Sequence, residues 1–182
     1  MSEPLQASAT GAEGSMIEGL FRAHPADEAL TRALSALGVD LKRLEPRYPS
    51  PTWAKVLEAT RQHWFPRLDA DEGTRQVGYE FSRGFQETLG GKMVLATLPL
   101  LNPMTLLMRW PRFVKLGRSD MLFSATKLGE KSVRLDATDP AGISPYFSVG
   151  ILGFIFERLR VTPRVRVERQ PPSSFTLFYE WD

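Results

Sequence analysis

The spacing of apolar residues changes once along the chain. Up to about residue 118, apolar positions recur every three or four residues, which is typical of amphipathic helices. Beyond that point they mostly alternate with polar positions, as in strands with one buried face. After a short apolar segment at 15–25, the predicted helices in the first part are 28–38, 50–66, 69–90, 92–101 and 103–117. The predicted strands lie in 119–138, around a turn at 128–131, and in 164–170 and 174–181. This order predicts an α+β fold, with N-terminal helices packed with a C-terminal antiparallel sheet.

One more predicted helix, 144–160, interrupts the strands and is apolar on nearly every side. Its large apolar side chains are Phe147, Val149, Ile151, Leu152, Phe154, Ile155, Phe156 and Leu159. Exposing them would cost on the order of 10–20 kcal/mol, at roughly 1.5–3 kcal/mol each, which is comparable to the stability of a whole domain. We therefore expect one buried helix, in which Gly150 and Gly153 let a neighbour approach closely. A dry core, a second subunit and a ligand are all compatible with this pattern.

Composition and charge limit the class of protein. The chain has 182 residues and a formal net charge of +2, which gives no reason to expect nucleic acid as a partner. It has no cysteine, which excludes disulfides, thiolate catalysis and sulfur-ligated metals. We expect a flexible N-terminal tail at 1–15, without signal-peptide character, and a single cytoplasmic domain at 16–182. The uncharged stretches 93–108 and 141–156 are shorter than the roughly 20 residues of a transmembrane helix, so no transmembrane segment is expected.

Three glycines in the helix predicted over 69–90 point to a close contact on one of its faces. Gly73, Gly78 and Gly84 each cost about 1 kcal/mol relative to alanine, a cost usually tolerated where a backbone or a ligand comes near. If this helix faces the apolar helix 144–160, the two enclose an apolar pocket. Its predicted ligand-binding residues are Phe81, Gly84, Phe85, Phe147, Gly150, Ile151 and Phe154.

A basic series is the second candidate surface. Arg109, Arg112, Lys115 and Arg118 follow one another at three-residue spacing around Trp110 and Phe113. The series fits a surface that docks an acidic protein partner or anionic lipid headgroups. It fits equally a solvated helix face whose long side chains shield the core.

No residue pattern predicts catalysis, a metal site or a cofactor. The sequence Gly-Gly-Lys-Met at 90–93 lacks the upstream glycine and the Ser/Thr of a P-loop. Asp136 and Asp139 have no wider set of candidate ligands around them. The only histidines are His24 and His63, and both read as structural. We therefore expect a non-enzymatic protein.

Short motifs occur in a fixed order along the chain. They are EGLFRA at 18–23, LGVDL at 37–41, Tyr48-Pro49 with Trp53, the set Gly78, Phe81, Gly84, Thr88 and Gly91, and Gly150, Gly153 and Glu157 with the terminal Trp181. With these motifs, residues 16–182 resemble a myxobacterial paralogous family of uncharacterised proteins of similar length. They also resemble the ligand-binding superfamily of nitric-oxide signalling and Golgi transport. That group includes heme-nitric-oxide-binding, 4-vinyl-reductase-type and TRAPP Bet-type domains.

The resemblance implies a helix–sheet cavity that holds an apolar molecule, such as an acyl chain or a tetrapyrrole in relatives. We therefore expect a sensor or adaptor that binds an apolar small molecule or lipid. An alternative is an interaction module with a filled core that binds a protein partner, or that forms a homodimer through the glycines of helix 69–90, as the transport-complex relatives dimerise through helices. A minor alternative is a heme-based gas sensor, although the Tyr-x-Ser-x-Arg motif of the sensing relatives is absent from this chain.

Overall fold

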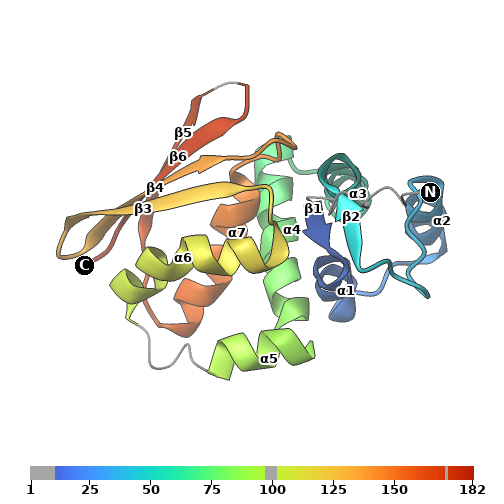
Figure 1. Cartoon of the computed structure of the whole chain (residues 1–182), viewed down its shortest axis with the longest axis horizontal. Helices are drawn as coiled ribbons and strands as arrows, with labels where there is room; N and C mark the ends of the chain where they lie inside the picture. The colour runs from blue at the N-terminus through green and yellow to red at the C-terminus, as the bar shows by residue number, and fades with distance from the viewer. Residues whose placement is uncertain (1–10, 97–101, 171) are drawn as a thin grey trace, which may run out of the picture.

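Helices and antiparallel strands make up the structure, a computed structural model that describes residues 11–96, 102–170 and 172–182 (Figure 1). The helices are α1 (Gly14–Arg22), α2 (Glu28–Ala36), α3 (Ser50–Trp64), α4 (Ala70–Phe85), α5 (Leu89–Ala96), α6 (Pro103–Gly117) and α7 (Tyr146–Arg158). The strands are β1 (Gly11–Glu13), β2 (Arg47–Pro49), β3 (Leu122–Gly129), β4 (Ser132–Thr138), β5 (Arg164–Gln170) and β6 (Ser174–Glu180). The α+β prediction is confirmed.

Polar caps begin three of the helices, as the sequence predicts. Asp27, Asp69 and Asn102 each accept a hydrogen bond of 2.8–3.0 Å from a backbone N–H in the first turn of α2, α4 and α6. Ser50 does not cap α3. It lies inside the first turn, and its hydroxyl donates instead to Asp120, far away in the sequence. Ser50 therefore ties α3 to the segment between α6 and β3.

The C-terminal strands form one antiparallel sheet in the order β3-β4-β6-β5. Val133 lies opposite Tyr179 and Leu135 opposite Leu177, and these side chains are at most 1% exposed. They belong to one hydrophobic core with side chains of α6 and α7, and both helices lie on the same side of the sheet in Figure 1. This is the two-layer packing that the change of period predicts.

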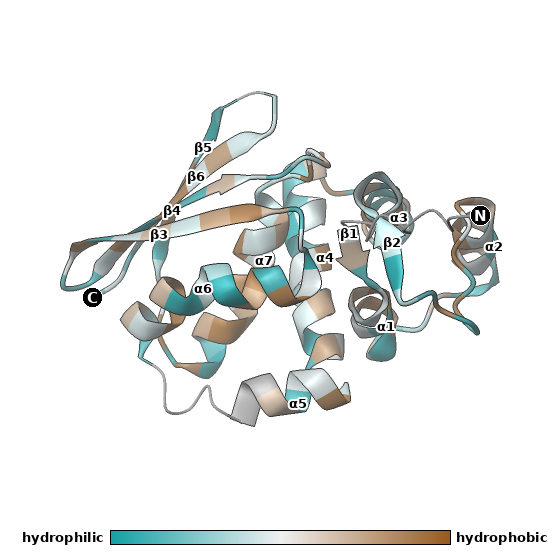
Figure 2. Cartoon of the chain, viewed as in Figure 1, coloured by the Kyte–Doolittle hydropathy of each residue, from teal (hydrophilic) through white to brown (hydrophobic). Residues whose placement is uncertain are grey.

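Helix α7 is buried between the sheet and α4, which confirms the interior position predicted for 144–160. The ring of Phe156 stacks on that of Tyr179 with the ring centres 5.6 Å apart. On the opposite side, α7 packs closely along α4 (Figure 2). The apolar residues all round α7 are explained by these two neighbours.

The N-terminal helices build a second hydrophobic core around Trp53, which is fully buried. Residues 11–15 belong to this part, so the prediction of a flexible tail up to residue 15 is wrong for them. Strand β1 pairs with β2, and Ala12 is fully buried. Gly11 and Gly14 lie against the backbone of β2 and of the segment before it, where a Cβ would come within 2.1 Å of a carbonyl oxygen. These small residues, which the sequence suggested belong to a flexible tail, are therefore required by close contact with a neighbouring backbone. Residues 1–10 lie outside the described part of the chain.

The helix predicted over 69–90 ends earlier, at Phe85. Thr88 makes the break, because its hydroxyl donates to the carbonyl of Phe85 at 2.7 Å and accepts from the N–H of Gly91 at 3.0 Å. Helix α5 then starts at Leu89, whose side chain is 80% exposed and does not join the hydrophobic core. The end of the helix predicted over 92–101, at 97–101, lies outside the described residues.

Candidate functional site

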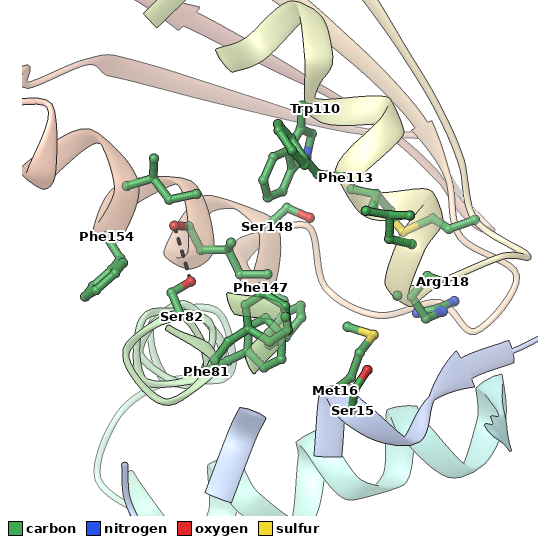
Figure 3. Close-up of a pocket in the computed structure, with 18 of the residues that line it drawn as sticks. Ser15, Met16, Phe81, Ser82, Trp110, Phe113, Arg118, Phe147, Ser148 and Phe154 are labelled. Carbon is green, nitrogen blue, oxygen red and sulfur yellow. Dashed lines mark hydrogen bonds between the residues drawn. The ribbon is translucent and has the colours of Figure 1, made fainter. Parts of the chain in front are cut away.

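An apolar cavity of about 540 Å³ lies between α1, α4, α6 and α7, with the sheet behind it (Figure 3). This volume is within the usual range for small-molecule sites. The larger apolar and aromatic side chains in its wall are Met16, Trp53, Phe81, Phe85, Leu89, Met93, Leu106, Trp110, Phe113, Leu116, Met121, Ile143, Phe147, Ile151, Phe154, Ile155 and Phe175. The two cores of the molecule therefore meet around this space.

All five large side chains predicted to bind a ligand line the cavity: Phe81, Phe85, Phe147, Ile151 and Phe154. The rings of Phe81 and Phe85 are stacked at 5.5 Å, and the ring of Phe147 lies 5.6 Å from that of Phe81 (Figure 3). Positions four apart on α4 and the first turn of α7 thus form one aromatic wall. The prediction of a cavity between these two helices agrees with this geometry.

The two glycines predicted to make room for a ligand act differently. Gly84 and Gly150 are absent from the cavity wall. A Cβ at Gly84 would lie 2.1 Å from the carbonyl oxygen of Gly19 on α1, and one at Gly150 would lie 1.9 Å from that of Arg75 on α4. Both glycines therefore admit a neighbouring backbone, so their assignment as ligand-binding residues is corrected. The three glycines of α4 all meet neighbours within the chain: Gly73 meets Arg61 of α3, Gly78 the backbone of α7, and Gly84 the backbone of α1. They are therefore not available for the homodimer contact considered from the sequence.

A buried ion cluster closes one end of the cavity. Arg118, which is 3% exposed, donates to Asp139 at 2.7 Å and to Asp120 at 2.9 Å. Burial by itself would lower the pKa of Arg118, but the hydrogen bonds to the two carboxylates outweigh it and leave that pKa raised. Burial likewise opposes ionisation of Asp120, yet hydrogen bonds from Arg118 and Ser50 keep the pKa of this carboxyl below its ordinary value. Two carboxylates therefore neutralise the one buried guanidinium.

The basic series of the sequence is divided by the structure. Arg109, Arg112 and Lys115 are exposed on α6 and form no ion pair with a described residue, whereas Arg118 is buried at the cavity. Its place in an exposed partner surface is therefore corrected. The reason is that α6 ends at Gly117, so the spacing of three no longer holds Arg118 on the helix face.

Several residues of the cavity were missed from the sequence. In the sequence, Trp110 and Phe113 were considered only as neighbours of the basic series. Leu106, Trp110 and Phe113 nevertheless share one apolar side of α6. Ser148 also lines the cavity, although it is only 7% exposed. A serine among the apolar residues of α7 was an available signal for it. Met16 carries no such signal.

The cavity wall does not fit heme. Heme iron takes an axial ligand such as histidine, cysteine, tyrosine or methionine, and the described wall offers only methionines of these types. The two histidines lie elsewhere: His24 stacks on Trp64, and His63 pairs with Asp27 at 2.8 Å. The only base in the described wall, Arg118, is already bound to two carboxylates, so it offers no free charge to a propionate. We derive no chemistry through heme.

Carboxylates elsewhere also have local partners. Asp136 accepts from Arg134 and Thr176, and Asp139 belongs to the Arg118 cluster. Within residues 11–96, 102–170 and 172–182, no group of three or more metal-ligating side chains is placed to hold an ion. Over the same ranges, none of the helices combines the length and apolar character needed to span a bilayer.

The fold has known counterparts among heme-nitric-oxide/oxygen-binding (H-NOX) domains. A structure from work on heme distortion in the H-NOX family matches with a TM-score of 0.71 and 11% identity, over 93% of this chain and 94% of that one. The oxygen complex of an oxygen-binding H-NOX domain related to soluble guanylate cyclases gives 0.69 and 12%, over 92% of each chain. An unliganded Fe(II) H-NOX mutant from K. algicida gives 0.68 and 12%, over 93% and 96%.

These matches define the class of fold as H-NOX-like, in agreement with the resemblance to the nitric-oxide signalling superfamily. The chain belongs to the family described as "Protein of unknown function (DUF2378)", whose model matches residues 11–182. No curated protein matches the sequence.

Proposed function

We propose that this protein is a non-enzymatic sensor or adaptor domain that binds one uncharged apolar molecule, of the size of an acyl chain, in the cavity between α1, α4, α6 and α7. The single observation that carries the proposal is the cavity of about 540 Å³ with its mostly apolar and aromatic wall. A cytoplasmic location, expected from the sequence, is part of the proposal.

The charges at the cavity favour an uncharged ligand. Arg118 is paired with Asp120 and Asp139, so the cluster carries a formal charge of one minus. Glu18 adds a second carboxylate at the wall, where it lies 3.9 Å from Arg22. An anionic headgroup placed inside would therefore lose its hydration without gaining a free cation. A fatty acid anion and a porphyrin dicarboxylate are both disfavoured for this reason.

Filling the cavity tests this proposal. Ser148 lies in the wall, so the variant Ser148→Phe places a ring in the cavity (Figure 3). A neutral fluorescent probe, N-phenyl-1-naphthylamine, is titrated into the wild type and the variant, and a long-chain methyl ester then competes with the probe. We expect saturable binding to the wild type and at least tenfold weaker binding to Ser148→Phe.

The matched control is Ser35→Phe, which adds the same ring on the exposed side of α2. It is expected to bind the probe like the wild type, and circular dichroism verifies that all three proteins are folded. Failure of the folded wild type to bind the probe saturably, or equal binding by Ser148→Phe, would overturn the proposal.

A further inference from the structure

The mouth of the cavity carries the most exposed large apolar side chains among the described residues. Leu89 and Met93 of α5 and Leu116 of α6 are 80%, 69% and 70% exposed, and all three belong to the cavity lining. We call these three residues the lip. Solvated apolar side chains of this size, gathered at one opening, are typical of a surface that contacts another apolar phase or a partner.

The stretch of sequence that contains the lip carries several cations and no carboxylate. Between Glu87 and Asp120 the sequence contains five Lys and Arg residues and no Asp or Glu. Three of them, Arg109, Arg112 and Lys115, are exposed and form no ion pair with a described residue. We call these three residues the basic face.

The basic face and Leu116, the lip residue on α6, share one side of that helix. At about 100° per residue, Leu116 projects between the directions of Arg109 and Arg112. Met108, which is 39% exposed, projects between those of Arg112 and Lys115. The solvent-facing side of α6 therefore alternates cations with apolar side chains, and one of these, Leu116, also belongs to the cavity lining.

We propose that the basic face and the lip dock this protein on an anionic lipid bilayer, with the cavity mouth turned toward the membrane. The cations lie at the level of the headgroups, and Leu89, Met93 and Leu116 enter the boundary of the acyl chains. In this orientation an apolar ligand passes from the bilayer to the cavity without crossing water. This use of the surface rests on the proposed function, whereas docking itself does not.

The charges favour a bilayer over a second copy of the chain. A two-fold dimer through this surface would bring two basic faces together, and like charges repel at such a contact. Glu18 of α1 lies at the cavity wall but pairs with Arg22, so it does not offer a free negative charge to the basic face of a second copy. A lipid surface supplies both the negative charge and the apolar phase that the lip requires.

Vesicle binding of the full chain tests the proposal. Sedimentation is measured with vesicles of phosphatidylcholine alone and of phosphatidylcholine with phosphatidylglycerol in equal parts. The basic-face variant is Arg109→Glu, Arg112→Glu and Lys115→Glu. Each cation near an anionic leaflet contributes about fivefold to partitioning, so we expect the variant to lose about 100-fold or more in binding to the anionic vesicles.

A matched control changes the same residue types on a distant surface. It is Arg32→Glu, Lys42→Glu and Arg43→Glu, all on exposed positions of α2 and the segment that follows. These elements lie at the end of the molecule away from α5 and α6 in Figure 1. For the lip, Leu116→Ser is compared with Leu128→Ser, a leucine that is 55% exposed in the β3–β4 hairpin. We expect binding to fall several-fold for Leu116→Ser and to stay unchanged for both controls.

The docking proposal is overturned by absence of binding to the anionic vesicles, by equal binding to the two vesicle types, or by a control that loses as much as the basic-face variant. It is also overturned if light scattering shows a dimer that the basic-face variant dissociates while vesicles stay unbound. Probe binding in solution, measured on the basic-face variant, is expected to match the wild type, because none of its three residues lines the cavity. Vesicle docking without probe binding would remove the proposed function and leave docking intact.

Discussion

Two glycines three positions apart on α7 allow a sharp test of the packing. A Cβ at Gly150 would lie 1.9 Å from the carbonyl oxygen of Arg75, whereas a Cβ at Gly153 would meet no atom within 4 Å. Real Cβ contacts start at about 3.0 Å, so Gly150→Ala must move α4 and α7 apart by about 1.1 Å. The matched change Gly153→Ala needs no movement.

The two variants are therefore expected to change stability in opposite directions. Overpacking that forces the backbone to move costs roughly 1–3 kcal/mol and occasionally more, and a contact about 1.1 Å too short lies at or above the upper end of that range. About 1 kcal/mol of helix propensity is subtracted from this cost. Gly150→Ala should destabilise the protein by roughly 1–3 kcal/mol, and Gly153→Ala should stabilise it by about 0.5–1 kcal/mol. For a chain of this length the melting temperatures should differ by roughly 5–12 °C.

Urea and thermal unfolding followed by circular dichroism measure this difference. The order expected is Gly153→Ala, then wild type, then Gly150→Ala. Equal stability of the two variants would refute the argument that α4 and α7 touch through backbone at Gly150.

Three further predictions concern the ion cluster and a cap. Arg118→Met should lower the free energy of unfolding by about 3–5 kcal/mol, because it leaves Asp139 and Asp120 without their cation. Combining it with Asp120→Asn and Asp139→Asn should recover most of this stability in chemical unfolding. No recovery would contradict ion pairing as the cause. Because the pKa of Asp120 is lowered in the folded state, its contribution is present above the ordinary value of 3.8 and is lost as the pH falls through the lower folded value. Asp120→Asn should therefore flatten the acid side of the stability curve, and an unchanged slope would argue against that linkage. Asn102→Ala removes the cap at the N–H of Thr105 and should cost about 1 kcal/mol; a neutral result in thermal unfolding would show that α6 does not depend on this cap.

The fold could be predicted from the sequence because its signals are local and repeated. Alternation around Leu135 and Leu177 defines the strands, and an apolar residue at almost every position of α7 requires burial on several sides. The end of α4 was missed because the hydroxyl of Thr88 stops the helix by a bond that no periodicity encodes.

The cavity could be predicted only in part. Aromatic residues at Phe81 and Phe147 indicate a shared face, and the structure brings them together. Whether a glycine such as Gly84 faces a ligand or a backbone depends on the neighbouring chain, so the sequence cannot distinguish the two. The burial of Arg118 depends on Asp139, twenty-one residues away, which is a tertiary contact.

We propose that the H-NOX-like fold of this chain holds an uncharged apolar molecule and not heme. Native mass spectrometry of the purified protein, mixed with equal amounts of a long-chain methyl ester, its free acid and hemin, tests it most directly. We expect the wild type and Ser35→Phe to bind one ester molecule per chain, and Ser148→Phe to bind none. A chain that stays bare, or that retains the acid or hemin in preference to the ester, would contradict it.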